Sequence, residues 1–131
     1  MRRHMLGRLE VAVLDHLWSS GLAEVRAVHA AVGAARGISP NTVHSALERL
    51  VRKGLAERRK AGRAYQYRAR LSREEWMAHG LERLASEVPG TPADTLIAAF
   101  VDMTERAGET QLAELERRVR ARRRRARKER G

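Results

Sequence analysis

The chain has 131 residues, a length that allows one domain or two small layers of packed secondary structure. It contains no cysteine, which excludes disulfides, thiolate metal sites and thiol redox chemistry. No apolar run approaches the roughly 18 residues of a membrane span, and the first ten residues lack the apolar core of a signal peptide. We therefore expect a cytoplasmic protein without membrane insertion.

The formal net charge of +11 is divided into blocks along the chain. Residues 1–75 hold 15 Lys and Arg against 7 Asp and Glu, residues 76–116 hold 2 against 8, and residues 117–131 hold 10 against 1. Charge that serves only solubility is normally interspersed, whereas a positive field attracts polyanions. The blocks indicate different partners for the three segments.

Three short elements are expected before residue 39. Apolar residues at helical spacing predict a first helix over about 8–19, which packs behind the elements that follow. Residues 22–24 suit a short strand, and residues 25–35 suit a second helix marked by valines. Residues 36–38 make a tight connection containing Gly37. Two helices joined by such a turn form a helix-turn-helix.

The stretch 39–54 is the helix around which the chain is organised. Ser39 can cap its start, Pro40 suits the first helical position, and Lys53 followed by Gly54 marks its end. One face is apolar, made by Val43, Ala46, Leu47, Leu50 and Val51. The opposite side carries Asn41, Thr42, Ser45, Glu48, Arg49 and Arg52. Short polar groups beside arginines are what a helix needs to enter a DNA major groove, and the alternative is an ordinary amphipathic helix with a solvated face.

A basic β-hairpin is predicted after Gly54. Residues 55–60 can be extended, residues 61–63 supply a turn, and residues 64–68 alternate as a strand with both tyrosines on one face. A helix-turn-helix followed by such a hairpin is a winged helix, whose wing can reach the DNA backbone or minor groove. The alternative interpretation is an edge strand protected by charge, and both can hold together.

Three further helices are predicted beyond residue 71. A capping box from Ser72 to Glu75 opens the first, Thr91-Pro92 opens the second, and Ala107-Gly108 separates the second from the third. Their apolar stripes are too short to enclose a core alone, so we expect them to pair with a second copy of the chain. The alternative is that they fold back on the winged helix. The residues assigned to dimerisation are Trp76, Leu81, Leu84, Leu96, Ile97, Phe100, Leu112 and Leu115.

The last residues form an arginine-rich tail, expected to be disordered or a frayed helix because like charges repel. It is either a non-specific phosphate clamp or a solvated end.

The sequence offers little for catalysis. The five histidines do not stand three or four residues apart, and there is no Gly-rich phosphate loop, so we expect no metal, cofactor or enzymatic activity. Two alternatives remain: a winged-helix regulator that senses a small molecule among the C-terminal helices, and a metal-dependent nuclease. The nuclease would use Asp94, Asp102, Glu105 and Glu109.

The run Thr42 to Tyr67, TVHSALERLVRKGLAERRKAGRAYQY, resembles the penicillinase-repressor family of bacterial transcription regulators, the BlaI/MecI/CopY type. The opening LGRLEVAVLDHLW and the SREE at Ser72 are also similar to that family, and the resemblance covers roughly residues 6–119. It implies a homodimer with N-terminal winged helices that binds palindromic operators and represses genes such as those for β-lactam resistance.

The resemblance also implies relief of repression by cleavage within the dimerisation region, triggered by a membrane sensor-protease. The family's Asn-Phe bond corresponds here to Ala99-Phe100, which keeps the Phe and lacks the Asn. The copper-responsive branch uses C-terminal cysteines, and this chain has none.

Together these observations predict a mostly α fold with a small β-wing. We expect a winged-helix DNA-binding domain over 1–71, a helical dimerisation region over 72–119 and the tail over 120–131. We predict a dimeric repressor that recognises an inverted-repeat operator on double-stranded DNA and controls β-lactam-resistance or cell-envelope-stress genes. The residues assigned to DNA are Asn41, Thr42, His44, Ser45, Arg49, Arg52, Lys60, Arg63 and Tyr65.

Overall fold

The computed structural model describes residues 6–131, so His4 and the first five residues of the predicted DNA-binding domain lie outside it. The chain divides into two compact units after Gly80. This division falls inside a helix, later than the predicted boundary at residue 71. Across the described residues, no helix combines the length and hydrophobicity needed to cross a bilayer.

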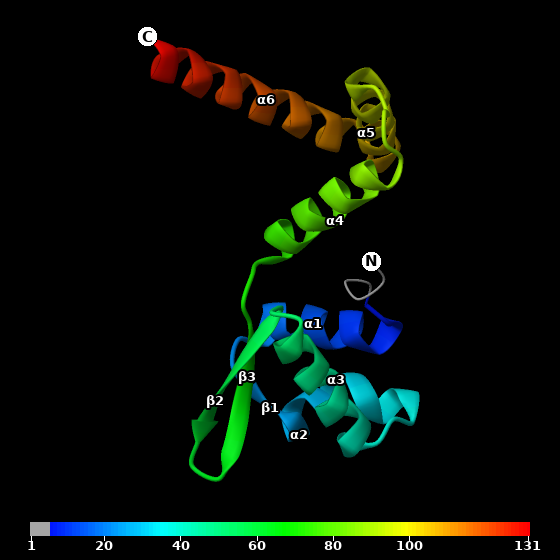
Figure 1. Cartoon of the computed structure of the whole chain (residues 1–131), viewed down its shortest axis with the longest axis vertical. Coiled ribbons are helices and arrows are strands. Elements are labelled where there is room, and N and C mark those ends of the chain that lie inside the picture. The colour runs from blue at the N-terminus through cyan, green and yellow to red at the C-terminus, as the bar shows by residue number, and fades with distance from the viewer. Residues whose placement is uncertain (1–5) are drawn as a thin grey trace. The chain divides into compact units, whose positions relative to one another are not determined.

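The first unit is built from three helical segments and a three-stranded antiparallel sheet (Figure 1). Its elements are α1 (Arg8–Ser20), β1 (Ala23–Glu24), α2 (Val25–Val28), α3 (Pro40–Arg52), β2 (Ala56–Ala61) and β3 (Ala64–Ala69). The strand order is β1-β3-β2, with Ala23 opposite Tyr67 and Arg58 opposite Tyr67 on the other side. The mostly α fold with a small β-wing is confirmed.

The second predicted helix is present but is not uniform. After α2 the chain widens into a π-helical segment, His29–Gly33, and then tightens into a 3-10 turn, Ala34–Arg36. Gly37 ends it with a φ of 68°, a conformation that glycine adopts without steric cost. The turn leads directly into α3, as a helix-turn-helix requires.

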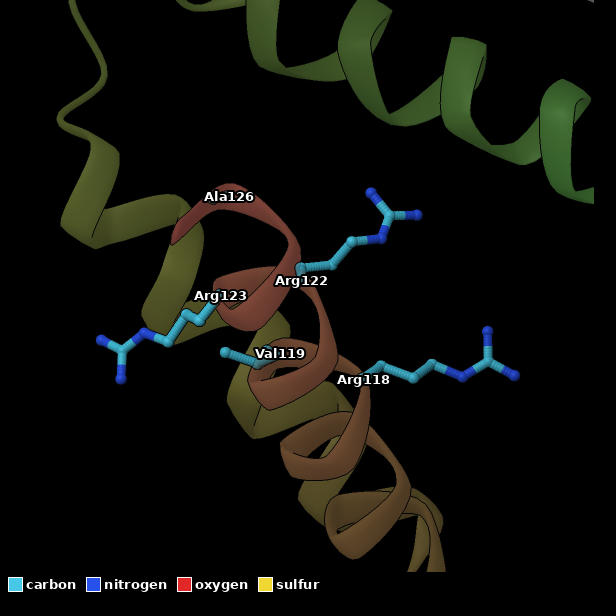
Figure 2. A pocket seen from close by; sticks show the side chains of 5 residues that line it. All are labelled: Arg118, Val119, Arg122, Arg123 and Ala126. Atoms are coloured by element: carbon cyan, nitrogen blue, oxygen red, sulfur yellow. The ribbon is translucent and has the colours of Figure 1, made fainter. Parts of the chain in front are cut away.

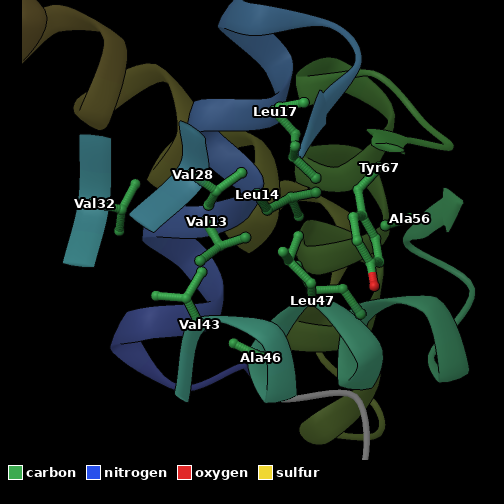
Figure 3. Packing of buried hydrophobic residues seen from close by; sticks show 12 residues of the cluster. Val13, Leu14, Leu17, Val28, Val32, Val43, Ala46, Leu47, Ala56 and Tyr67 are labelled. Carbon is green, nitrogen blue, oxygen red and sulfur yellow. The ribbon is translucent and has the colours of Figure 1, made fainter. Parts of the chain in front are cut away.

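The core of this unit lies between α1, α3 and the sheet (Figure 3). Leu14, Leu47, Leu50 and Tyr67 are fully buried there, and burying each aliphatic side chain contributes about 1.5–3 kcal/mol. The apolar face of α3 therefore fixes the rotation of that helix. Its polar face is left to point outward.

The second unit contains helices only. α4 (Arg73–Glu87) runs across the division, and α5 (Ala93–Ala107) and α6 (Glu109–Arg130) follow and contact each other. Over their whole described length, α4, α5 and α6 contain no buried residue.

Residues 120–130, predicted to be a disordered or frayed tail, belong to the continuous helix α6. Arginine and alanine are good helix formers, and Glu114 to Arg118 and Glu116 to Arg120 form ion pairs one turn apart. These local terms favour the helix against the repulsion among the arginines that follow.

Candidate nucleic-acid interface

The N-terminal end of α3 is capped as its sequence predicts. The Ser39 hydroxyl accepts a hydrogen bond from the Thr42 backbone amide at 3.2 Å, and Pro40 occupies the first helical position. The Ser39 and Thr42 hydroxyls lie 3.0 Å apart. A cap of this kind contributes about 1 kcal/mol and defines where the helix begins.

The outward face of α3 carries short polar side chains. Asn41, Thr42, His44 and Ser45 are all exposed, whereas Val43 on the opposite face is fully buried. Arg52 is exposed one to two turns further on. The helix rotation predicted from the sequence is thus confirmed.

Arg49 and Lys53 are turned toward α1 by a buried carboxylate that the sequence analysis did not single out. Glu10 is only 7% exposed; its Oε2 lies 3.0 Å from Lys53 Nζ and 3.6 Å from Arg49 Nε. Its Oε1 accepts a hydrogen bond from the Gly7 amide at 3.0 Å. Burial alone would raise the pKa of Glu10, but the Gly7 amide, Lys53 and Arg49 together hold it below 4.5. This pair of contacts joins the C-terminal half of α3 to α1, and the Arg49 side chain remains 42% exposed.

At Gly33 the second helical segment packs tightly against α3. A Cβ added there would lie 2.8 Å from His29 Cδ2 and 2.9 Å from Cγ2 of the buried Val43. His29 Nε2 also lies 2.7 Å from the Ile38 carbonyl oxygen, which ties the turn to the preceding segment. Glycine is therefore required at this crossing by space, because its φ of −95° is ordinary.

The wing is the hairpin of β2 and β3. Its strands pair from Ala56 with Ala69 to Ala61 with Ala64, so Gly62 and Arg63 make a two-residue turn. Gly62 has a φ of 67°, as the first central position of a type II′ turn requires. Lys60 and Arg63 are exposed at this tip, and Tyr65 is 41% exposed beside it.

The wing is joined to α3 by a network centred on Glu48. The hydroxyl of the buried Tyr67 donates to Glu48 Oε2 at 2.5 Å, and Arg58 donates to Glu48 Oε1. Arg58 also lies over the Tyr65 ring, 4.6 Å from its centroid, which is a cation-π contact. His44 Nε2 lies 3.8 Å from the same carboxylate.

The pKa values of this network follow from its contacts. The Tyr67 hydrogen bond, followed by Arg58 and His44, lowers the pKa of Glu48 below 4.5 although partial burial opposes the change. Burial and the neighbouring Glu48 carboxylate raise the pKa of Tyr67 to about 12. Neither Tyr67 nor Arg58 was predicted as a site residue. The predicted alternation places both tyrosines on one face of the strand, and the structure shows that Tyr67 is the buried one.

An open hollow of about 470 Å³ lies beside this network. Its floor and walls come from the start of α2, from α3 and from β3. The residues lining it are Glu24, Val25, Arg26, His44, Ala64, Tyr65 and Tyr67. It therefore opens beside His44 on α3 and the two tyrosines of β3.

Trp76, one of the residues predicted for dimerisation, packs within the first unit. Its ring packs 5.7 Å from that of Trp18, whose Nε1 donates to the Leu71 carbonyl at 2.9 Å. Arg73 lies over the Trp18 ring and pairs with Asp15 at 2.5 Å. The first turns of α4, opened by the predicted Ser72 to Glu75 capping box, therefore belong to the first unit.

The other residues predicted for dimerisation lie on the helices after Trp76. Exposed apolar side chains include Leu81, Leu84, Leu96, Ile97 and Phe100, from 39% to 63% exposed, while Leu112 and Leu115 are partly covered. Ala99 and Phe100 are in the middle of α5. The four carboxylates of the nuclease alternative lie on α5 and α6, and among the described residues no three His, Cys, Asp or Glu side chains gather as a metal site would require.

A helix-turn-helix whose second helix presents a polar face, followed by a β-hairpin with a cationic tip, defines a winged-helix DNA-binding domain. Comparison with known proteins agrees with this class. Residues 6–121 match the family model described as penicillinase repressor. The transcriptional regulator BlaI of Mycobacterium tuberculosis, found in two strains, is 35% identical over 119 residues, covering 85% of this chain and 85% of that protein.

Two solved structures are also similar. The complex structure of hsRosR-S1 has a TM-score of 0.51 at 18% identity and covers 82% of this chain and 96% of that one. The DNA-binding domain of the repressor BlaI in solution has a TM-score of 0.49 at 22% identity and covers 54% and 87%. The chain therefore belongs to the penicillinase repressor family. It is a transcriptional repressor of the BlaI-like type with a winged-helix DNA-binding domain.

Proposed function

We propose that the chain acts as a dimer that binds an inverted-repeat DNA operator and blocks transcription from it. The observation that carries this proposal is the outward face of α3, where exposed short polar groups are held in place by a buried apolar face. A helix so presented can place hydrogen-bonding groups at base edges in a major groove. Membership of a repressor family supports the same interpretation.

Within this proposal, two groups of side chains have different tasks. Asn41, Thr42, His44 and Ser45 face base edges and select the sequence. The remaining side chains hold phosphates, or a guanine or the minor groove, and act largely without regard to sequence. These are Arg49, Arg52, Lys60, Arg63 and Tyr65.

The contact between Arg49 and Glu10 bears on this division. Glu10 already neutralises part of the positive charge at the C-terminal end of α3. Arg49 therefore contributes less to the affinity for DNA than an arginine without an acidic neighbour would. Arg52 and the wing tip are the stronger candidates for phosphate contacts.

Dimerisation is supported by the helices of the second unit. Their apolar side chains are exposed in a single chain, and a second copy would cover them. A symmetric dimer would present two copies of α3 to two half-sites, which is the geometry that an inverted repeat matches.

Relief of repression through a membrane sensor-protease is proposed by analogy with the family, with the Ala99-Phe100 bond as the cleavage position and β-lactam-resistance or envelope-stress genes as targets. The bond lies inside α5, so a protease must first unwind that helix. Incubation with the sensor system followed by mass spectrometry tests this step. Loss of DNA binding on adding a small molecule, with the chain uncut, would replace proteolysis by ligand sensing.

The decisive experiment is selection of bound duplexes from a random DNA pool. An enriched inverted repeat supports the proposal and defines the half-site spacing. On that operator, Ser45→Ala should change the preferred base, whereas Arg63→Ala should weaken all sequences alike and reduce the salt dependence. Failure of the wild-type chain to enrich any sequence would refute operator recognition.

A further inference from the structure

The C-terminal end of α6 is a cationic segment outside the part of the chain that matches the family. The family match ends at residue 121, and α6 continues to Arg130. Residues 122–130 contain seven Lys and Arg and a single acidic residue, Glu129. All of them are exposed.

The arginines surround the helix. Figure 2 shows Arg118 and Arg122 extending to one side and Arg123 to another. Because a helix has about 3.6 residues per turn, the four consecutive arginines 122–125 point in all directions. The last apolar stripe residue of α6 is Val119, so this segment has no apolar face with which to lie in a membrane surface.

The ion pairs recorded on α6 all involve arginines that precede residue 122. The ion pairs of α6 connect Glu114 and Glu116 to arginines 117, 118 and 120. Among the described residues, no acidic side chain pairs with arginines 122–125. Cations one helical turn apart, such as Arg123 and Arg127, repel each other, and an anionic partner would relieve that repulsion.

We propose that residues 122–130 form a second DNA-binding element that grips the phosphates of duplex DNA without reading its sequence. At about 1.5 Å per residue the segment spans about 14 Å, and a duplex carries about eight phosphates over that length, at about 1.7 Å per charge. Seven cations against about eight phosphates is a close match in charge density. The choice of duplex DNA as the partner rests on the proposed function. If α3 binds a duplex, that duplex is held at high effective concentration near α6 because both helices belong to the same chain.

The test measures binding of the full chain to a random-sequence duplex over a range of salt concentrations. Replacing all four arginines 122–125 by Gln should reduce the slope of log K against log salt by about 2, because each phosphate contact contributes about 0.9 and about half of these arginines lie on the side of the helix that faces the duplex. Replacing them by Lys should leave most of the slope, because charge and helix propensity are retained.

A matched pair of double variants separates local contact from total charge. Arg124→Gln with Arg125→Gln and Arg83→Gln with Arg106→Gln remove the same charge, and only the first pair should lower the slope. Equal slopes for both pairs, or a wild-type slope in the fourfold Gln variant, would overturn the proposal.

A measurement without substitution complements these variants. Hydrogen exchange of backbone amides over 122–130 in the wild-type chain should slow when the random duplex is added, and unchanged exchange counts against the proposal. Single-stranded RNA and anionic vesicles serve as comparison probes, and slowing by either one but not by the duplex would identify a different partner. A wild-type chain that ignores every duplex would instead refute the proposed function itself.

Discussion

The two units of the chain bury their apolar residues very differently. In the first, Val13, Leu14 and Leu47 have no solvent exposure at all, whereas in the second Leu84 and Ile97 are 62% and 63% exposed. Both segments have helices with clear apolar stripes. An apolar stripe alone therefore does not make a core. The first unit covers α3 with a sheet and two helices, whereas the contact between α5 and α6 leaves no residue of those helices buried.

Separating the two units should have the largest effect. A fragment ending at Gly80 retains Trp76 on Trp18 and the whole buried core, so it should fold and sediment as a monomer. The full chain should sediment as a dimer at the same concentration. Dimers formed by the fragment would mean that the exposed helices are not the main self-association surface.

Leu47→Ala should produce the next largest effect. Leu47 lies on the buried face of α3, and removing such a side chain costs about 2–5 kcal/mol in the free energy of unfolding. Leu96→Ala is the matched change in the second unit, where the leucine is 43% exposed. Chemical denaturation at several protein concentrations measures both changes. The loss of unfolding free energy should be independent of protein concentration for Leu47→Ala and should depend on it for Leu96→Ala. The same behaviour in both variants would contradict the different roles assigned to the two units.

Glu10→Gln tests the ionic contact that orients α3, and should cost about 1–3 kcal/mol, as lost hydrogen bonds to charged groups do. Because the folded pKa of Glu10 is lowered, its contribution to stability is present above 4.5 and is lost as pH falls through the folded pKa. The difference in unfolding free energy between wild type and variant should therefore shrink as pH falls below 4.5. A constant difference across that range would show that the carboxylate charge is not what matters.

Tyr67→Phe should have the smallest effect, at the lower end of the about 1.5–3 kcal/mol that a hydrogen bond to a charged group contributes, because the buried ring is kept and Arg58 still pairs with Glu48. Tyr65→Phe is the control, since the ring that Arg58 covers is retained. The raised pKa of Tyr67 also predicts loss of stability as pH rises from 10 through about 12, and less of this loss in the Phe variant. Equal stability losses in the two variants would remove the role assigned to the Tyr67 hydroxyl.

Much of the first unit could be predicted because its signals are local. The Ser39 cap, the stripe from Val43 to Leu50 and the glycine turn at Gly62 depend on neighbours a few residues away. Helical period and turn chemistry capture such relations directly. Once the buried stripe of α3 was predicted, its exposed face was determined as the opposite side of the same helix.

What the sequence could not reveal depends on contacts between distant positions. Glu10 meets Lys53 across two helices, and Tyr67 meets Glu48 across a helix and a strand. Trp76 has the same apolar character as the leucines that follow it, so only the packing against Trp18 separates it from them. Because this packing joins the first turns of α4 to the first unit, the division between the two units falls inside α4.

The missing side chain at Gly33 has a consequence for how such a repressor can change. With no atom to spare between His29 and Val43, the approach angle of α3 is set by its inner surface and is independent of the residues that face outward. Under the proposed function, Asn41 or Ser45 can therefore be exchanged during evolution to change the target site while the packing behind α3 is kept. A methyl group at Gly33 would have the opposite effect: every outward side chain would be kept, but α3 would be displaced from its seat on the preceding helical segment.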